Sequence, residues 1–362
     1  MRVTVRSYAK INLGLRIGGL RADGYHELHT VYQTIALHDR LRVQVTSGSG
    51  IEVRCADPRV PTNESNTCYR LLERAMAALK ARGRVVVEIE KKLPVQGGLG
   101  GASSNAIAAV LALQRALQKQ VPGPEMLRLA AEVGSDLPLF LIGGTVLGAG
   151  RGEEVYPLAD LPPTPCVIAT PEIGISTPKA FADWDALGAT SGEESGTSSA
   201  TAAGEQTAAS SPRDGLPRAE DKLTLFAPSD KMLKFGRSVA VWLSAFSQRK
   251  IRSGRALSGV PASKGRGRAE TPLLDLVRTG IENDFEQVVF PQYPELREVK
   301  RVLRRAGAGY ASLSGSGSAV FGLFSARAAA QKAAMALRKA GVEAAATTTL
   351  TRSQYWRRIF DC

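Results

Sequence analysis

The sequence predicts an α+β protein with two domains, at residues 1–160 and 161–362. The chain has 362 residues, 44% of them hydrophobic, which is enough to build two cores. Stretches of alternating polarity and stretches with helical spacing of apolar residues follow each other along most of its length. The proline-rich joint Leu161–Pro165 separates two such series, so we place the domain boundary just before it.

In the first series, strands and helices are expected in turn. The expected strands are Val3–Arg6, Leu41–Thr46 and Val85–Ile89, and the expected helices are Thr67–Arg82, Asn105–Leu117 and Met126–Val133. Gly134, Ser135 and Asp136 end the last of these helices. The apolar run Leu137–Ile142 is then expected to form a further strand.

The second series begins with an expected strand at Cys166–Thr170. Towards the end of the chain we expect the helix Glu295–Ala306, two strands within Tyr310–Phe324 around a glycine–serine turn, the helix Ala326–Ala340 and the strand Ala344–Leu350.

Two segments of the second domain have the composition of insertions, at about 186–222 and 247–271, on either side of an expected helix at Lys222–Phe246. Residues 188–213 contain no Val, Ile, Leu or aromatic residue, so we expect disorder there. Residues 247–270 hold seven Lys or Arg residues and one Glu, with no aromatic side chain to stack on bases. A solvated basic loop is therefore favoured over an RNA contact, despite the net charge of +13.

Other bulk features narrow the class of protein. The longest apolar runs, such as Ala106–Leu113, are far too short to span a membrane. The N-terminus alternates from its first residues and lacks an apolar signal region, so we expect it to be a first strand. The four cysteines form no C-x-x-C pair, and YHELH lacks the H-E-x-x-H spacing, so no resident metal is expected. These features favour a cytoplasmic protein.

The stretch Leu93–Asn105, LPVQGGLGGASSN, places four glycines between an expected strand and an expected helix. A Walker loop needs a lysine, which this stretch lacks. A dinucleotide fingerprint needs a third glycine where Ser103 stands and an acidic residue about 20 positions later, and both are missing. What remains is a loop whose backbone amides close around an anion at the start of a helix, where the helix dipole favours phosphate. The glycines permit close approach and positive φ, while Ser103 and Ser104 would cap the helix or contact phosphate or Mg²⁺.

Residues 94–105 resemble the P-x-x-x-G-L-G-G-S/G/A-S-S signature of the small-molecule kinases named for galactokinase, homoserine kinase, mevalonate kinase and phosphomevalonate kinase, the GHMP kinases. More specifically, Tyr8–Leu15 followed by Arg21–Leu28 resembles the opening of the 4-diphosphocytidyl-2-C-methyl-D-erythritol kinase family. Three later segments agree in order: Gly134–Pro138, Ser176–Phe181, and Asn283–Glu286 with the Ser314–Ser318 turn. The resemblance covers the chain except the two insertions.

The resemblance implies a fold and an activity. The fold would combine an N-terminal ATP-binding domain, like domain 2 of ribosomal protein S5, with a C-terminal ferredoxin-like α/β domain. The activity would be ATP-dependent phosphorylation of the 2-hydroxyl of 4-diphosphocytidyl-2-C-methyl-D-erythritol in the non-mevalonate isoprenoid pathway, with Mg²⁺ accompanying ATP. The ATP-binding residues it implies are Pro94, Gly97, Gly98, Leu99, Gly100, Gly101, Ser103, Ser104 and Asn105.

Three residues are implied at the reacting hydroxyl. Kinase chemistry needs a group that directs the proton of the attacking hydroxyl, and the resemblance assigns this role of general base to Asp136. It places Lys10 beside Asp136, where an ammonium steadies the transferring phosphoryl group, and Asn12 at the polyol end of the substrate. Without the resemblance, Asp136 would be read as a turn former and Lys10 as a solvated strand-edge residue.

Four further residues are implied on the substrate side. Tyr25 would stack on the cytosine ring and His26 would hydrogen bond to it. Thr177 and Phe181 match a T-P-x-x-F segment that puts Phe181 across the base from Tyr25. Read alone, His26 is typical of a surface-loop histidine.

Two alternatives stay open on the sequence. Another GHMP kinase, of the homoserine or mevalonate type, would leave Tyr25, His26 and Phe181 without a purpose. The other alternative is a nucleotide-binding protein without turnover, or an RNA-associated protein that uses the basic insertion. Gln96 and Ala102 stand where the family more often has glycine or another small residue, although the signature leaves position 96 open and admits alanine at position 102.

Overall fold

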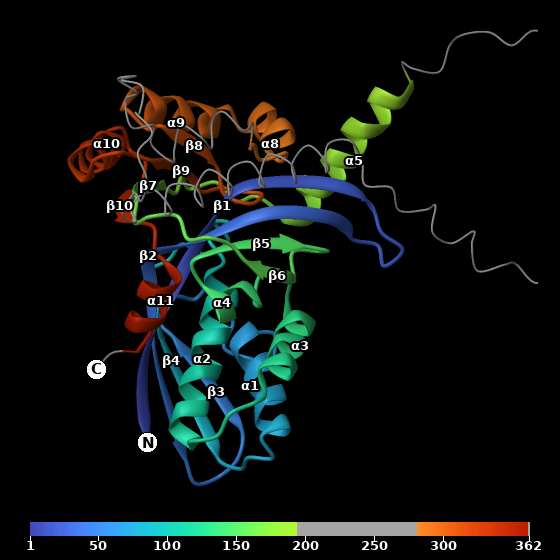
Figure 1. Cartoon of the computed structure of the whole chain (residues 1–362), viewed down its shortest axis with the longest axis vertical. Helices are drawn as coiled ribbons and strands as arrows, with labels where there is room; N and C mark the ends of the chain where they lie inside the picture. The colour runs from blue at the N-terminus through green and yellow to red at the C-terminus, as the bar shows by residue number, and fades with distance from the viewer. Residues whose placement is uncertain (194–280, 361–362) are drawn as a thin grey trace, which may run out of the picture.

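The protein, seen here in a computed structural model that describes residues 1–193 and 281–360, is built in layers (Figure 1). Helices α1 and α2 cover the outer face of a six-stranded sheet, and helices α9 and α10 cover the outer face of a four-stranded sheet. The inner faces of the two sheets pack against each other.

The six-stranded sheet has the order β3-β4-β2-β5-β6, with β1 paired to β2. Its strands are β1 (Arg2–Leu20), β2 (His26–Thr46), β3 (Ile51–Cys55), β4 (Arg84–Glu90), β5 (Thr145–Ala149) and β6 (Glu154–Pro157). The helices on its side are α1 (Thr67–Ala78), α2 (Gly101–Leu117), α3 (Gly123–Val133) and α4 (Leu139–Ile142). Every pairing is antiparallel except that of β3 with β4.

The four-stranded sheet has the order β10-β7-β9-β8 and is antiparallel throughout. Its strands are β7 (Pro165–Ala169), β8 (Tyr310–Leu313), β9 (Val320–Leu323) and β10 (Ala344–Thr348). The remaining helices of the described residues are α5 (Thr177–Glu193), α8 (Glu286–Gln292), α9 (Pro294–Arg305), α10 (Arg327–Lys339) and α11 (Arg352–Arg358). The β7 strand thus pairs with strands that lie far from it in the sequence.

The middle of β1 is buried on both faces, because each residue from Ser7 to Leu15 is enclosed by the helices on one side or the second sheet on the other. Its apolar residues Ala9, Ile11 and Leu13 pack against Phe321 and other residues of the four-stranded sheet. The β1–β2 register shifts between Tyr8 and Lys10 and again between Asn12 and Gly14. Such bulges re-aim side chains, and here they flank Lys10 and Asn12.

The end of the chain returns to the first sheet, beside the N-terminal part of β1 (Figure 1). Tyr355 of α11 is buried in the core of the first sheet, and its hydroxyl donates to the Phe140 carbonyl at 2.7 Å. The Arg6 amide donates to the Ile359 carbonyl at 2.7 Å. The division at 160/161 stays a prediction, and these contacts add C-terminal residues to the first core.

Most of the expected elements are present, and three of the differences concern helices. Leu139–Ile142 is the helix α4 and not a strand, because a short apolar run is compatible with either and Gly143, at φ +70°, closes it as a helical turn. Helix α2 begins at Gly101 instead of Asn105. Helix α5 continues to Glu193, into the segment where disorder was expected from residue 188.

The expected helix Lys222–Phe246, the basic segment and the rest of the glycine- and serine-rich segment lie outside the described residues. Within residues 1–193 and 281–360, no helix has the length and apolar character needed to cross a membrane.

Candidate active site

Two cavities adjoin at the glycine loop, residues 97–101. The smaller, of about 390 Å³, is lined by the loop and by residues 59–61 and 65–68, and its charged residues, Arg59 and Lys91, suit an anion. The larger, of about 730 Å³, lies between the β1–β2 hairpin, α5 and the turn at residues 314–318, which we call the support turn. Gly98 and Ser103 line both cavities, so groups bound in the two would meet there.

Two glycines of the loop are required by the protein itself. Gly98 and Gly100 have φ angles of +72° and +68°, which other residues rarely adopt. A Cβ on Gly98 would collide with the Ser314 carbonyl, and one on Gly100 would lie 3.0 Å from both Lys10 Cγ and Phe140 Cζ. Glycine was expected here because of the ligand. The close approach of the support turn and of Lys10 is a second reason for glycine at these positions.

The two serines after the loop have different surroundings. The N-cap of α2 is Gly100, and no side chain caps the helix, so the expected serine cap is wrong. Ser104 is buried, with its Oγ 2.7 Å from Ser7 Oγ, and is not among the residues that line the smaller cavity. Ser103 lines both cavities, while Asn105 lines the smaller one. Of the two serines, Ser103 reaches the cavities and Ser104 does not, and contact of either with phosphate stays a prediction.

Lys10 of β1 and Asp136 of the α3–α4 connection form an ion pair, with Nζ 3.2 Å from Oδ2. The side chain of Lys10 is only 4% exposed, whereas that of Asp136 is 32% exposed and reaches the larger cavity. Lys10 Nζ also donates to Asn12 Oδ1 at 2.8 Å, and Asn12 Nδ2 donates to Thr30 Oγ1 at 2.7 Å. The structure thus brings together the three residues that the sequence predicted at the reacting hydroxyl.

Tyr32 of β2 is a site residue that the sequence analysis missed. It pairs with Asn12 in the β1–β2 register, and its hydroxyl donates to Asp136 Oδ1 at 3.0 Å. Burial, followed by the negative charge of Asp136, raises the pKa of Tyr32 well above its ordinary value. Tyr32 therefore remains a hydrogen-bond donor that holds one oxygen of Asp136 and leaves the other beside Lys10.

The wall formed by the β1–β2 hairpin and α5 contains the predicted base-binding residues. The His26 ring stacks on Phe181, with centroids 5.0 Å apart and planes at 9°, and its Nε2 lies 2.7 Å from Asp185 Oδ1. Tyr25 is 54% exposed, and the Arg151 guanidinium lies 4.8 Å from the centre of its ring. All of these residues line the larger cavity, while a base held between Tyr25 and Phe181 stays a prediction.

The support turn connects this wall to the glycine loop. Thr177 Oγ1, at the start of α5, lies 2.8 Å from Ser316 Oγ. Ser314 Oγ donates to the Gly98 carbonyl at 2.9 Å, and the Ala319 amide donates to the Gly97 carbonyl at 3.1 Å. One turn of the second sheet therefore lines the larger cavity and contacts the glycine loop that both cavities share.

Family models match both halves of the chain. The GHMP kinases N terminal domain matches residues 66–144, which include the glycine loop and Asp136, and the GHMP kinases C terminal model matches residues 270–343. Together with the adjoining cavities and the Lys10–Asp136 pair, these matches define the class: an ATP-dependent small-molecule kinase with the GHMP fold.

Proteins of similar sequence show to which family of GHMP kinases the chain belongs. A 4-diphosphocytidyl-2-C-methyl-D-erythritol kinase of Solibacter usitatus is 33% identical over 320 residues, 88% of this chain and 80% of that one. Another, of Acaryochloris marina, is 31% identical over 338 residues, 93% of this chain and 92% of that one. The chain belongs to the 4-diphosphocytidyl-2-C-methyl-D-erythritol kinase family.

Solved structures agree in fold. A crystal structure of 4-(cytidine 5'-diphospho)-2C-methyl-D-erythritol kinase is 30% identical, with a TM-score of 0.64, and the match covers 96% of this chain and 98% of that one. A homoserine kinase from Cytophaga hutchinsonii has a TM-score of 0.65 with 17% identity, covering 97% and 95%, and shares the fold. The expected family and α+β fold are confirmed.

Proposed function

We propose that this protein transfers the γ-phosphoryl group of ATP to the 2-hydroxyl of 4-diphosphocytidyl-2-C-methyl-D-erythritol, giving the 2-phosphate and ADP, as a step of the non-mevalonate isoprenoid pathway. The observation that carries the proposal is the Lys10–Asp136 pair, which lies in the larger cavity near the loop that both cavities share. The larger cavity also has room for a cytidylated alcohol, and its wall offers aromatic and imidazole groups.

The transfer would proceed directly, without a phosphoenzyme. The hydroxyl oxygen of the substrate forms a bond to the γ-phosphorus while the bond from that phosphorus to the β,γ-bridging oxygen breaks. The hydroxyl proton passes to Oδ2 of Asp136, the oxygen beside Lys10, while Tyr32 holds Oδ1. The Lys10 ammonium offsets the negative charge of the transferring group.

ATP would occupy the smaller cavity, with its phosphates at Gly97–Gly101 and at the first turn of α2. The first N–H groups of a helix have no partner within it, and Gly101, Ala102 and Ser103 stand at that position in α2 and line the cavity.

Mg²⁺ binds in kinases chiefly through substrate phosphates and one or two carboxylates. Here the Ser103 hydroxyl, which lines both cavities, would hold the ion together with the ATP phosphates, and the ion would neutralise phosphate charge when bound.

We also propose a cytoplasmic location and a small-molecule partner without nucleic acid. The described cysteines, Cys55, Cys68 and Cys166, are free thiols, which suits a reducing compartment.

The test is ADP release by the purified chain with ATP, Mg²⁺ and, separately, the cytidylated erythritol, homoserine or mevalonate. We expect turnover only with the first alcohol. Turnover with homoserine or mevalonate would refute the substrate, and no ADP release with any of them would refute the kinase reaction as proposed.

A further inference from the structure

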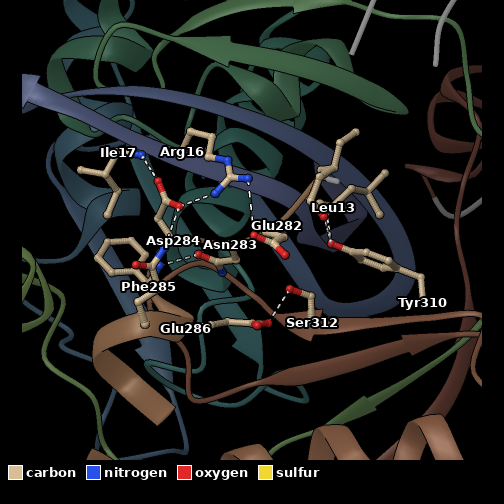
Figure 2. A network of polar contacts seen from close by, with 12 residues as sticks. Leu13, Arg16, Ile17, Glu282, Asn283, Asp284, Phe285, Glu286, Tyr310 and Ser312 are labelled. Carbon is tan, nitrogen blue, oxygen red and sulfur yellow. Dashed lines mark hydrogen bonds and ion pairs between the residues drawn. The ribbon is translucent and has the colours of Figure 1, made fainter. Parts of the chain in front are cut away.

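A polar segment outside the reacting pair, Asn283–Glu286, reaches several walls of the larger cavity. It lies where the chain enters α8, between β1 and β8, and Figure 2 shows Asp284 directed toward Arg16 and Ile17 on one side. Glu286 is directed toward Ser312 on the other side.

Asp284 fastens the segment to β1 just before the hairpin. Its side chain is 1% exposed and accepts hydrogen bonds from the Ile17 amide at 2.9 Å and from Arg16 Nη1 at 2.5 Å. The backbone adds two bonds, from the Leu15 amide to the Glu282 carbonyl and from the Asp284 amide to the Leu15 carbonyl, each of 2.9 Å. A few residues further on, β1 turns through the hairpin that carries the base-binding wall.

Asn283 fastens the same segment to the support turn. Its Nδ2 donates to the Leu313 carbonyl at 2.9 Å and to the Gly315 carbonyl at 2.8 Å, while Oδ1 accepts from the Phe285 amide at 3.1 Å. The side chain is 2% exposed, so these bonds have no competition from solvent. The support turn in turn holds Gly98 of the glycine loop.

Phe285, between the two anchors and the α8 helix, completes the arrangement. It is 2% exposed, lines the larger cavity and packs edge-on against Phe181, with ring centroids 5.0 Å apart and planes at 75°. One short segment thus contacts the strand that leads to the hairpin, the aromatic wall, and the turn beneath the glycine loop.

We propose that Asn283 and Asp284 are positioning residues of the phosphoryl transfer. Asp284 fixes the place of the hairpin, and therefore the binding of the alcohol substrate; Asn283 fixes the support turn, and therefore the glycine loop that binds ATP. The inference rests on the proposed function for its alcohol substrate. It predicts that two adjacent residues affect the two substrates differently, which a general loss of stability would not do.

The experiment compares Asp284→Asn, Asn283→Ala and the control Glu286→Gln in steady-state kinetics with both substrates varied. Asp284→Asn should raise KM for the alcohol by at least about fivefold and leave KM for ATP within about twofold. Asn283→Ala should raise KM for ATP by a similar factor. Arg16→Lys should shift the alcohol KM in the same direction as Asp284→Asn, and it serves if the latter fails to fold.

Glu286→Gln is the matched control because its carboxylate, 14% exposed, has partners that all belong to the second sheet and its helices: Ser312, Leu313 and Lys300. It should lower the melting temperature and leave both KM values within about twofold of wild type.

Calorimetric titration with ATP alone measures how Asn283→Ala changes the affinity for ATP, without any turnover. It therefore separates failure of this inference from failure of the proposed function. Weaker ATP binding by Asn283→Ala, with Asp284→Asn unchanged, supports the inference even if no alcohol is phosphorylated. The inference would be overturned if each variant raised KM for ATP and KM for the alcohol equally. It would also be overturned if the control shifted KM as much as the two variants do.

Discussion

Replacing Gly98 by alanine tests whether the glycine loop depends on close contact with the support turn. Gly98 has φ +72°, and its Cβ would collide with the Ser314 carbonyl. A non-glycine residue in the left-handed region costs about 1–2 kcal/mol, and overpacking a close contact costs about 1–3 kcal/mol. Gly98→Ala should therefore lose roughly 2–5 kcal/mol of folding free energy, part of it as displacement of the loop.

Thermal melting followed by fluorescence measures the loss. At roughly 2 °C per kcal/mol, Gly98→Ala should melt about 4–10 °C below wild type, and its KM for ATP should rise. Gly123→Ala is the control: a Cβ there meets nothing within 4 Å, and its backbone lies outside the positive-φ region. Melting of Gly98→Ala within about 1 °C of wild type would refute the reasoning.

Three further predictions concern other parts of the structure. Tyr32→Phe removes the hydrogen bond to Asp136, so kcat should fall by about tenfold with little change in either KM; a KM effect alone would contradict this role. Asp185→Ala frees the His26 ring and should raise KM for the alcohol, whereas Asp183→Ala, whose carboxylate accepts from Lys179, should not; equal kinetics for the two would count against it. Burial raises the pKa of Tyr32, Tyr310 and Tyr355. Above about pH 10 the unfolded chain therefore releases protons that the folded chain retains. These groups leave the free energy of unfolding constant below that pH and should lower it above that pH. A melting temperature that does not decline between about pH 9 and 11 would contradict the last prediction.

The elements that the sequence predicted well are those whose pattern is local. The α10 helix was expected at Ala326–Ala340 and observed at Arg327–Lys339, because its apolar residues recur on one face. Strand β1 was expected only at Val3–Arg6 and observed at Arg2–Leu20. The middle of β1 also alternates, with Lys10 and Asn12 between Ala9, Ile11 and Leu13, but both of its faces are buried, so its polar residues face the site instead of solvent.

In the candidate site, too, the residues within local motifs were predicted and the long-range contacts were not. Lys10, Asp136 and Asn12 were identified through a motif resemblance, and the structure brings them within hydrogen-bonding distance. Tyr32 was missed because its role depends on the register of two strands. The support of Gly98 by Ser314 joins positions 216 apart, which no local pattern reveals.

The role of Asp136 as general base is tested most directly by kcat of Asp136→Asn with ATP and the cytidylated erythritol. Asparagine keeps the shape and can still accept from Tyr32, but it cannot take the proton of the hydroxyl. We expect kcat to fall by about 10²–10⁴-fold, with KM for both substrates and the melting temperature near those of wild type. A variant that keeps more than about a tenth of the wild-type kcat would contradict the assignment of the base.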